Sequence, residues 1–176
     1  CADNSPNSIA VLAAAPRGTL LHAPDCYMDK IAAGPELAGH VSLDGGVTYN
    51  LEQAAYVLDK PISEVKVVAL NRERHAELFK EIREAGAHLS LMGDGDVSAA
   101  IWAARPDGPY DMLLGIGAAP EGVITATALR GIGGVFEGRL IFRSDEEEKR
   151  AEKMVDDDLT RLWDATDLCR SDDAIF

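Results

Sequence analysis

The sequence predicts an α/β fold in which helices cover a mostly parallel sheet. Between residues 64 and 142, short apolar runs alternate with segments of helical period, and the connections between them are short. Of the 176 residues, 47% are hydrophobic, and a chain of this length can bury a sizeable core. Nothing along residues 1–176 marks a boundary, so we expect a single domain.

The first sixty residues are the least regular part of the chain. The apolar segments 8–15 and 19–23 flank a Pro-Arg-Gly turn, which predicts two short antiparallel strands. Residues 23–39 are expected to be irregular, with one short strand. Residues 50–60 carry leucine and alanine at helical spacing, and Pro61 is expected to end that helix.

The middle of the chain alternates regularly between the two kinds of element. The predicted strands are 64–70, 88–92, 110–117 and 135–142, and the predicted helices are 72–86, a segment beginning near Asp96, and 120–134. Gly86 stands where a helix-ending glycine is common, Asp96 is a good N-cap, and Pro120 suits a first turn. Short connections between such elements predict strands that run in one direction.

Acidic residues gather near the end of the chain. Residues 144–173 are expected to form an acidic helical tail with a second short helix at 158–168, and residues 172–176 look like the start of a strand. The net charge of −13 makes nucleic acid and anionic membranes poor partners. The rest of the chain is only mildly acidic and could still hold a basic pocket for an anionic ligand.

Cysteine and histidine usage indicates the compartment and argues against zinc. The three cysteines are scattered, which favours reduced thiols in a cytoplasmic protein, and the four histidines lack metal-ligand spacing. We see no signal peptide and no apolar stretch of the roughly 18 residues that cross a bilayer. The chain begins with Cys1 rather than methionine, so we expect a fragment of a longer protein.

Three consecutive predicted strands end in polar loops. These loops are NRERH (71–75), GDGD (93–96) and GIGAAPEG (115–122). In an open α/β sheet, ligands bind beyond the carboxyl ends of the strands, so parallel strands would bring all three loops to one edge.

The side chains of these loops suit a phosphorylated sugar and a divalent ion. Arg72 and Arg74 offer planar charged groups that match phosphate. Asp94 and Asp96 could accept sugar hydroxyls or hold a hard cation, and Glu121 is a plausible oxygen ligand for Mg²⁺ or Mn²⁺.

Each of these residues also has an ordinary structural explanation. Arginines at the start of a helix are commonly solvated, an aspartate before a helix is commonly its N-cap, and a glutamate in a first turn commonly faces the helix dipole. Taken together on one edge, the functional and the structural interpretations both stay open.

Two long segments carry a resemblance to a known family. LNRERHAELFKEIREAGAHLSLMGDGDVSAAI and LLGIGAAPEGVITATALRGIGGVFEGRL resemble the class II fructose-1,6-bisphosphatases, and the cyanobacterial type that also acts on sedoheptulose-1,7-bisphosphate is similar. The resemblance implies the layered α/β/α/β fold of the lithium-sensitive phosphatases. It also implies hydrolysis of the 1-phosphate of fructose-1,6-bisphosphate to fructose 6-phosphate by water that Mg²⁺ or Mn²⁺ activates, in gluconeogenesis or the Calvin cycle.

The resemblance also implies roles for particular residues. Glu121 falls on the family's metal-ligating glutamate. The positions that match substrate contacts are Tyr27, Arg72, Glu73, Arg74, Asp94, Gly95, Asp96 and Ala118. Many relatives have glycine where this chain has Ala118, and a backbone contact would survive that change.

The family's catalytic Asp-Pro-x-Glu-Gly-Thr motif is expected upstream of Cys1. The chain then corresponds to the substrate-binding half, and we predict that it is inactive or nearly so by itself. A cytoplasmic homo-oligomer, dimer or tetramer, is expected. Two alternatives stay open: a non-catalytic sugar-phosphate-binding module, and a lithium-sensitive phosphatase with another substrate, such as an inositol phosphate.

Overall fold

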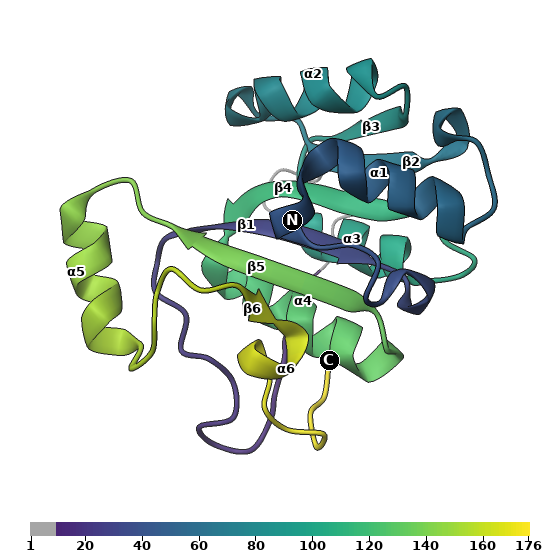
Figure 1. The fold of residues 1–176 in the computed structure, drawn as a ribbon. Coiled ribbons are helices and arrows are strands. Elements are labelled where there is room, and N and C mark those ends of the chain that lie inside the picture. Colours follow the sequence, from purple (N-terminus) through teal and green to yellow (C-terminus); the bar gives the residue numbers. More distant parts are fainter. Residues whose placement is uncertain (1–9) are drawn as a thin grey trace.

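The structure, a computed structural model, describes residues 10–176 and has a six-stranded sheet at its centre (Figure 1). The order of the strands is β3-β2-β4-β1-β5-β6. The strands are β1 (Tyr27–Ala33), β2 (Lys66–Leu70), β3 (His88–Met92), β4 (Met112–Ala118), β5 (Val135–Ile141) and β6 (Trp163–Asp164).

The sheet is mixed, although most of its strands share one direction. β2 pairs in parallel with β3 and β4, whereas β1 lies antiparallel between β4 and β5. The four strands predicted between residues 64 and 142 therefore run the same way, as expected. Because β1 runs the opposite way, its first residue, Tyr27, lies beside Ala118 and Ile141 at the ends of β4 and β5.

Helices cover both faces of the sheet. α1 and α2 lie on one face and α3 and α4 on the other (Figure 1), and the α/β class is confirmed. The helices are α1 (Gly46–Val57), α2 (Ala76–Glu84), α3 (Asp96–Ala104), α4 (Ala119–Ile132), α5 (Asp145–Met154) and α6 (Ala165–Leu168).

Two apolar cores hold these layers together, and β1 contributes to both. Successive side chains of a strand point to opposite faces. Met28 and Ala32 belong to the core under α3 and α4, whereas Ile31 and Ala33 belong to the core under α1 and α2. The charged residues of β1 follow the same alternation, so Lys30 points to the α3 side and Asp29 to the α2 side.

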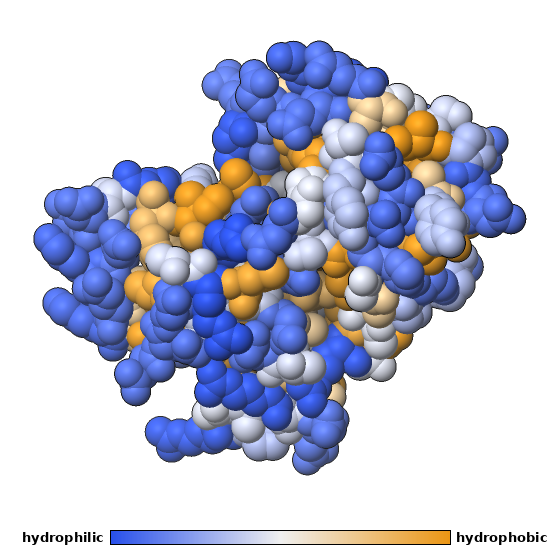
Figure 2. Space-filling model, in the orientation of Figure 1, coloured by the Kyte–Doolittle hydropathy of each residue, from blue (hydrophilic) through white to orange (hydrophobic). Residues whose placement is uncertain are grey.

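The outer surfaces of the molecule are polar. Hydrophilic side chains cover α2 and α5 (Figure 2), and α5 begins with four consecutive acidic residues after Ser144, whose hydroxyl accepts a hydrogen bond from the Glu147 amide. Charge at this end suits the helix dipole. No helix of the described residues is long and apolar enough to cross a bilayer.

The predicted antiparallel pair of segments 8–15 and 19–23 is wrong for the residues that the structure describes. Both segments pair instead with the end of the chain, Ala14 with Ile175 and Leu20 with Cys169. Residues 8 and 9 lie outside the described part. Pairing between residues so distant in sequence leaves no local pattern. The Pro-Arg-Gly turn between the two segments is a local pattern, and it favoured a hairpin that does not form.

Two further details differ from expectation. Asp96 is not the N-cap of α3: Gly95 holds that position with φ of +93°, and Asp96 turns inward as the first helical residue. Residues 158–168, expected as a short helix alone, include β6 before α6. Gly86, with φ of +88°, follows α2 as expected, and Pro120 stands in the first turn of α4.

Candidate active site

The three polar loops meet at one edge of the sheet, as the parallel strands require. Arg72, after β2, donates a hydrogen bond of 2.7 Å to Gly93 O after β3, and lies 3.9 Å from Asp94. Arg74 donates from Nε and Nη2 to Ile116 O of β4, at 3.1 and 2.6 Å. All the site residues expected from the sequence lie at this edge: Tyr27, Arg72, Glu73, Arg74, Asp94, Gly95, Asp96, Ala118 and Glu121.

Tyr27 is the centre of a positively charged group. The guanidinium carbon of Arg74 lies 4.8 Å from the centroid of the Tyr27 ring, and that of Arg143 also lies 4.8 Å from it. Cation–π contacts at such distances hold both arginines near the ring. Together with Arg72, they provide three permanent positive charges along the ends of β2 and β5.

Arg143 was not predicted from the sequence, although a signal was present. It follows the fourth strand of the alternating series, whose carboxyl end lies at the same edge as the three polar loops. Its Nε donates to Glu147 Oε1 at 2.8 Å, and its backbone N–H donates to Glu147 Oε2 at 2.9 Å. These hydrogen bonds lower the pKa of Glu147, so that carboxyl is ionised and holds Arg143 in place.

A buried ion pair stands beside this charged group. Lys30 Nζ lies 2.7 Å from Asp96 Oδ2, and the two side chains are only 2% and 8% exposed. Gly117 makes room for the pair, because a Cβ there would clash with Asp96 Oδ2 and lie 2.9 Å from Lys30 Nζ. Asp94, in contrast, is exposed and accepts a hydrogen bond of 3.0 Å from the Gly95 amide.

Glu121 lies in the first turn of α4, close to that ion pair. Partial burial and the negative charge of Asp96 raise the pKa of Glu121, while the ammonium group of Lys30 lowers it. Its side chain is nonetheless exposed. A carboxylate near a second carboxylate and open to solvent suits a hard divalent cation by the chemistry of its oxygen atoms. Within residues 10–176, no three or more His, Cys, Asp and Glu side chains group as a metal site.

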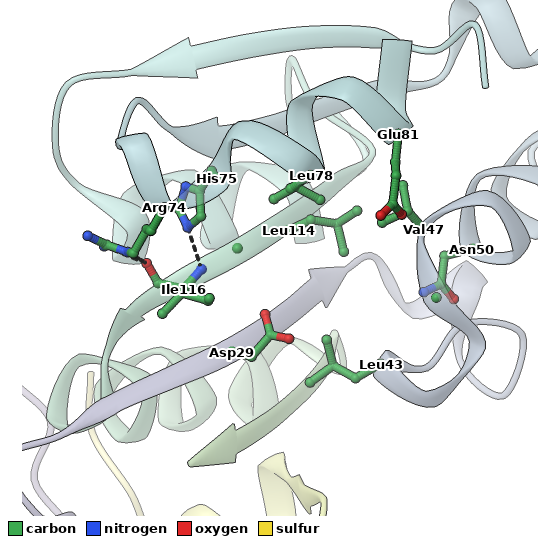
Figure 3. A pocket seen from close by; sticks show the side chains of 12 residues that line it. Asp29, Leu43, Val47, Asn50, Arg74, His75, Leu78, Glu81, Leu114 and Ile116 are labelled. Carbon is green, nitrogen blue, oxygen red and sulfur yellow. Dashed lines mark hydrogen bonds between the residues drawn. The ribbon is translucent and has the colours of Figure 1, made fainter. Parts of the chain in front are cut away.

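A cavity of about 210 Å³ adjoins the edge on the α1–α2 side of the sheet (Figure 3). Its charged and polar lining comes from Asp29, Asn50, Arg74, His75 and Glu81, and the apolar side chains around them include Val47, Leu78 and Leu114. Burial raises the pKa of Asp29, whereas a hydrogen bond from the Lys30 amide lowers it. The cavity is separate from the exposed Glu121, and it reaches the edge through Arg74 and Ile116.

The fold and site define an α/β protein with arginines and carboxylates gathered where parallel strands end. The family model described as bacterial fructose-1,6-bisphosphatase, glpX-encoded, matches residues 1–176. The chain belongs to this family of bacterial fructose-1,6-bisphosphatases, which confirms the resemblance stated from the sequence.

Relatives from cyanobacteria are similar over all or most of the chain. A protein of Synechococcus elongatus named D-fructose 1,6-bisphosphatase class 2/sedoheptulose 1,7-bisphosphatase is 42% identical over 188 residues, covering 100% of this chain and 54% of the relative. One of Acaryochloris marina with the same name, numbered 2, is 51% identical over 138 residues, covering 78% of this chain and 40% of the relative. The chain thus spans about half the length of the curated relatives it matches.

Proposed function

We propose that the chain provides the substrate-binding part of a fructose-1,6-bisphosphatase, which hydrolyses the 1-phosphate to give fructose 6-phosphate. The observation that carries the proposal is the gathering of Arg74 and Arg143 on the Tyr27 ring, at the same ends of the strands as Arg72, the Lys30–Asp96 pair and Glu121. A sugar bisphosphate has two dianionic ends, and it needs cations at both. Arginines serve one end, and the carboxylate at the other end would hold a metal.

The arginines would bind the phosphate that is not cleaved. Arg74 uses two N–H groups on Ile116 O, and the geometry of a guanidinium directs its other three N–H bonds away from that carbonyl. Arg143 donates from Nε and Nη2 to Glu147, which leaves Nη1 for phosphate, and Arg72 donates from Nη1 to Asn71 O and Gly93 O, which leaves Nε and Nη2. Charge-assisted hydrogen bonds to phosphate oxygens are the typical role of such groups.

The acidic residues would bind the sugar and the metal. Asp94 is exposed and could accept hydroxyl protons, Gly95 lets a ligand approach the backbone, and Ala118 would offer a backbone group. Glu73, exposed in the turn before α2, is a further candidate for the sugar. Because Asp96 points inward, we infer that it orients the sugar with its second oxygen while Lys30 holds the first.

Glu121 would hold Mg²⁺ or Mn²⁺. Such an ion, when bound, neutralises charge on the scissile phosphate and lowers the pKa of water. We expect the protein to work as a cytoplasmic homo-oligomer in gluconeogenesis or the Calvin cycle, and we expect the residues of this chain alone to release little phosphate.

Equilibrium binding of fructose-1,6-bisphosphate tests the proposal. Wild-type protein should bind it, and Arg74→Ala should weaken binding by roughly tenfold to a hundredfold, as expected for a lost hydrogen bond between charged groups. Arg83→Ala is the matched control, because Arg83 is an exposed arginine near the far end of α2. Equal affinity of both variants would refute the assignment of Arg74, and no binding by wild type would refute the function.

Sedoheptulose-1,7-bisphosphate is a second candidate substrate, because the names of the relatives include both activities. Competition between the two sugars in the same titration compares them directly. Binding without any dependence on Mn²⁺, together with no phosphate release from the complete protein, would favour a non-catalytic module instead.

A further inference from the structure

Two consecutive residues hold the backbone of Ile116, one at each of the two peptide groups that flank its Cα. The N–H of Ile116 donates to His75 Nε2 at 2.8 Å, and the carbonyl of the same residue accepts two hydrogen bonds from Arg74 (Figure 3). Arg74, which we assign to phosphate binding, is therefore held by the carbonyl of a residue whose N–H is held by His75.

These contacts determine the tautomer of His75. A backbone N–H can only donate, so Nε2 must be the unprotonated acceptor. The proton is then on Nδ1, which lies 2.7 Å from Leu70 O and donates to it. The ring is 2% exposed and packs edge-on against Phe79, with 5.8 Å between the ring centroids.

The imidazole occupies a gap between two strands. The β2–β4 ladder includes only Val67 with Met112 and Val68 with Leu113, so the strands separate before their carboxyl ends. His75 spans this gap, from Leu70 O on β2 to Ile116 N on β4. The ring thereby replaces the missing ladder hydrogen bonds.

Gly115 leaves the space that the ring needs. Its φ is +138°, and a Cβ at this position would lie 3.0 Å from Cε1 of His75, closer than most Cβ contacts. The first glycines of the GIGAAPEG loop therefore have different neighbours: Gly115 accommodates His75, and Gly117 accommodates the Lys30–Asp96 pair.

We propose that His75 is a positioning residue for sugar-phosphate binding. As the Nδ1–H tautomer it fixes the Gly115–Ile116 peptide group and thereby the backbone of Ile116, whose carbonyl, in the next peptide group, orients the guanidinium of Arg74. The same stretch of backbone begins the loop that leads to Glu121, so His75 couples the phosphate-binding arginine to the metal-binding loop. This inference rests on the proposed function and adds a residue to it.

Two substitutions separate the two hydrogen bonds of the ring. The amide of asparagine reaches about as far as Nδ1, so His75→Asn keeps a donor for Leu70 O and loses the acceptor for the Ile116 N–H. The amide of glutamine reaches about as far as Nε2, so His75→Gln keeps that acceptor and loses the donor. His88→Asn and His88→Gln are the controls, because His88 is exposed on β3.

The readout is the dissociation constant for fructose-1,6-bisphosphate, with the melting temperature of each variant as a measure of folding. We expect His75→Asn to weaken binding about tenfold or more, because a displacement of about 1 Å at a positioned group can be that costly. His75→Gln should restore most of the affinity even if both variants melt at the same lower temperature.

A double-mutant cycle tests whether His75 acts through Arg74. His75→Asn combined with Arg74→Ala should weaken binding little more than Arg74→Ala alone, since residues in one network are not additive. Additive losses would overturn the proposal, as would wild-type affinity in His75→Asn. Absence of binding by the wild type would refute the proposed function itself.

Nitrogen NMR of the wild-type imidazole gives a test that needs no variant. The pattern of couplings between ring nitrogens and ring protons distinguishes the two neutral tautomers. The Nδ1–H form is the result we expect, with slow hydrogen exchange at the Ile116 amide. An Nε2–H form would overturn the proposal, whatever the protein binds.

Discussion

Lys30 and Asp96 form an ion pair with 2.7 Å between Nζ and Oδ2, and both side chains are almost completely buried. The lysine comes from the middle of β1 and the aspartate from the first turn of α3. Because a buried charge loses its hydration, neither residue is stable in this position without the other. The pair also accounts for the inward orientation of Asp96, which keeps it from capping α3.

Lys30→Met should destabilise the protein strongly. Removal of one partner leaves Asp96 buried and unpaired, which typically costs about 3–5 kcal/mol in the free energy of unfolding. Urea unfolding at neutral pH measures the loss. Lys80→Met is the control, because Lys80 is 61% exposed, 3.8 Å from Glu77, and should change stability by less than about 0.5 kcal/mol. Similar effects of the two substitutions would contradict the importance of the buried pair.

Two glycine-to-alanine substitutions should have opposite effects. At Gly117 the new methyl group would collide with Asp96 and crowd Lys30, and such overpacking typically costs about 1–3 kcal/mol. At Gly131, in the last turn of α4, nothing lies within 4 Å of the new methyl group. Alanine should stabilise that helix by about 0.5–1 kcal/mol. Thermal unfolding of both variants measures the two changes in Tm. Changes of the same sign would contradict the prediction.

Glu121→Gln should stabilise the metal-free protein at neutral pH. The pKa of Glu121 is raised in the folded state, so the folded protein binds its proton more tightly than the unfolded chain does. The ionised carboxylate therefore costs stability above that pKa, and the cost disappears as the pH falls through it. Since water screens this exposed group, we expect a gain of only about 0.5 kcal/mol at neutral pH, or roughly 1–2 °C in Tm.

The same variant tests the metal assignment. Mn²⁺ should raise the Tm of the wild type if it binds the folded state, and Glu121→Gln should reduce that increase. Glu152→Gln, on the exposed surface of α5, should respond to Mn²⁺ as the wild type does. A full response in Glu121→Gln would rule out Glu121 as a ligand.

The cysteines at positions 26 and 169 should resist alkylation in the folded protein. Both are buried, and burial together with nearby negative charge raises the pKa of the Cys26 thiol to about 11. The thiolate is the reactive form, so little of it exists at mildly alkaline pH. Mass spectrometry after iodoacetamide treatment should locate label on these two residues only when denaturant is present. Rapid native labelling of Cys26 would contradict its burial.

Residues 64–142 were predictable because each strand and helix there has a local pattern. The predicted polar loops also met at one edge, since the parallel direction of three strands is sufficient to bring them together. β1 was expected only as a short strand in an irregular segment. Its Asp29 and Lys30 are unusual in a central strand, and Lys30 is tolerated only because Asp96 neutralises it from α3.

Three charged or polar residues of the site were missed for different reasons. Lys30 and His75 owe their positions to partners on other elements, which no spacing along the chain reveals. Arg143 could have been found, because it directly follows a predicted strand of the parallel series. For Glu121 and the arginines, the chemistry of the loops suggested metal and phosphate binding but left the ordinary interpretation of a helix start open, and the family resemblance favoured the functional one.

The place of β1 has a consequence for the order in which the protein folds. Roughly eighty residues separate the end of β1 from β4, its first partner, and β5 follows later still. During synthesis β1 is made before either of its neighbouring strands. Both of its edges are then unpaired, and unpaired edges are open to incorrect pairing. Contacts so distant in sequence form slowly. Tyr27 can meet Arg143 only after β5 has docked beside β1, so this contact between the two ends of the chain cannot form before residues 135–143 have been synthesised.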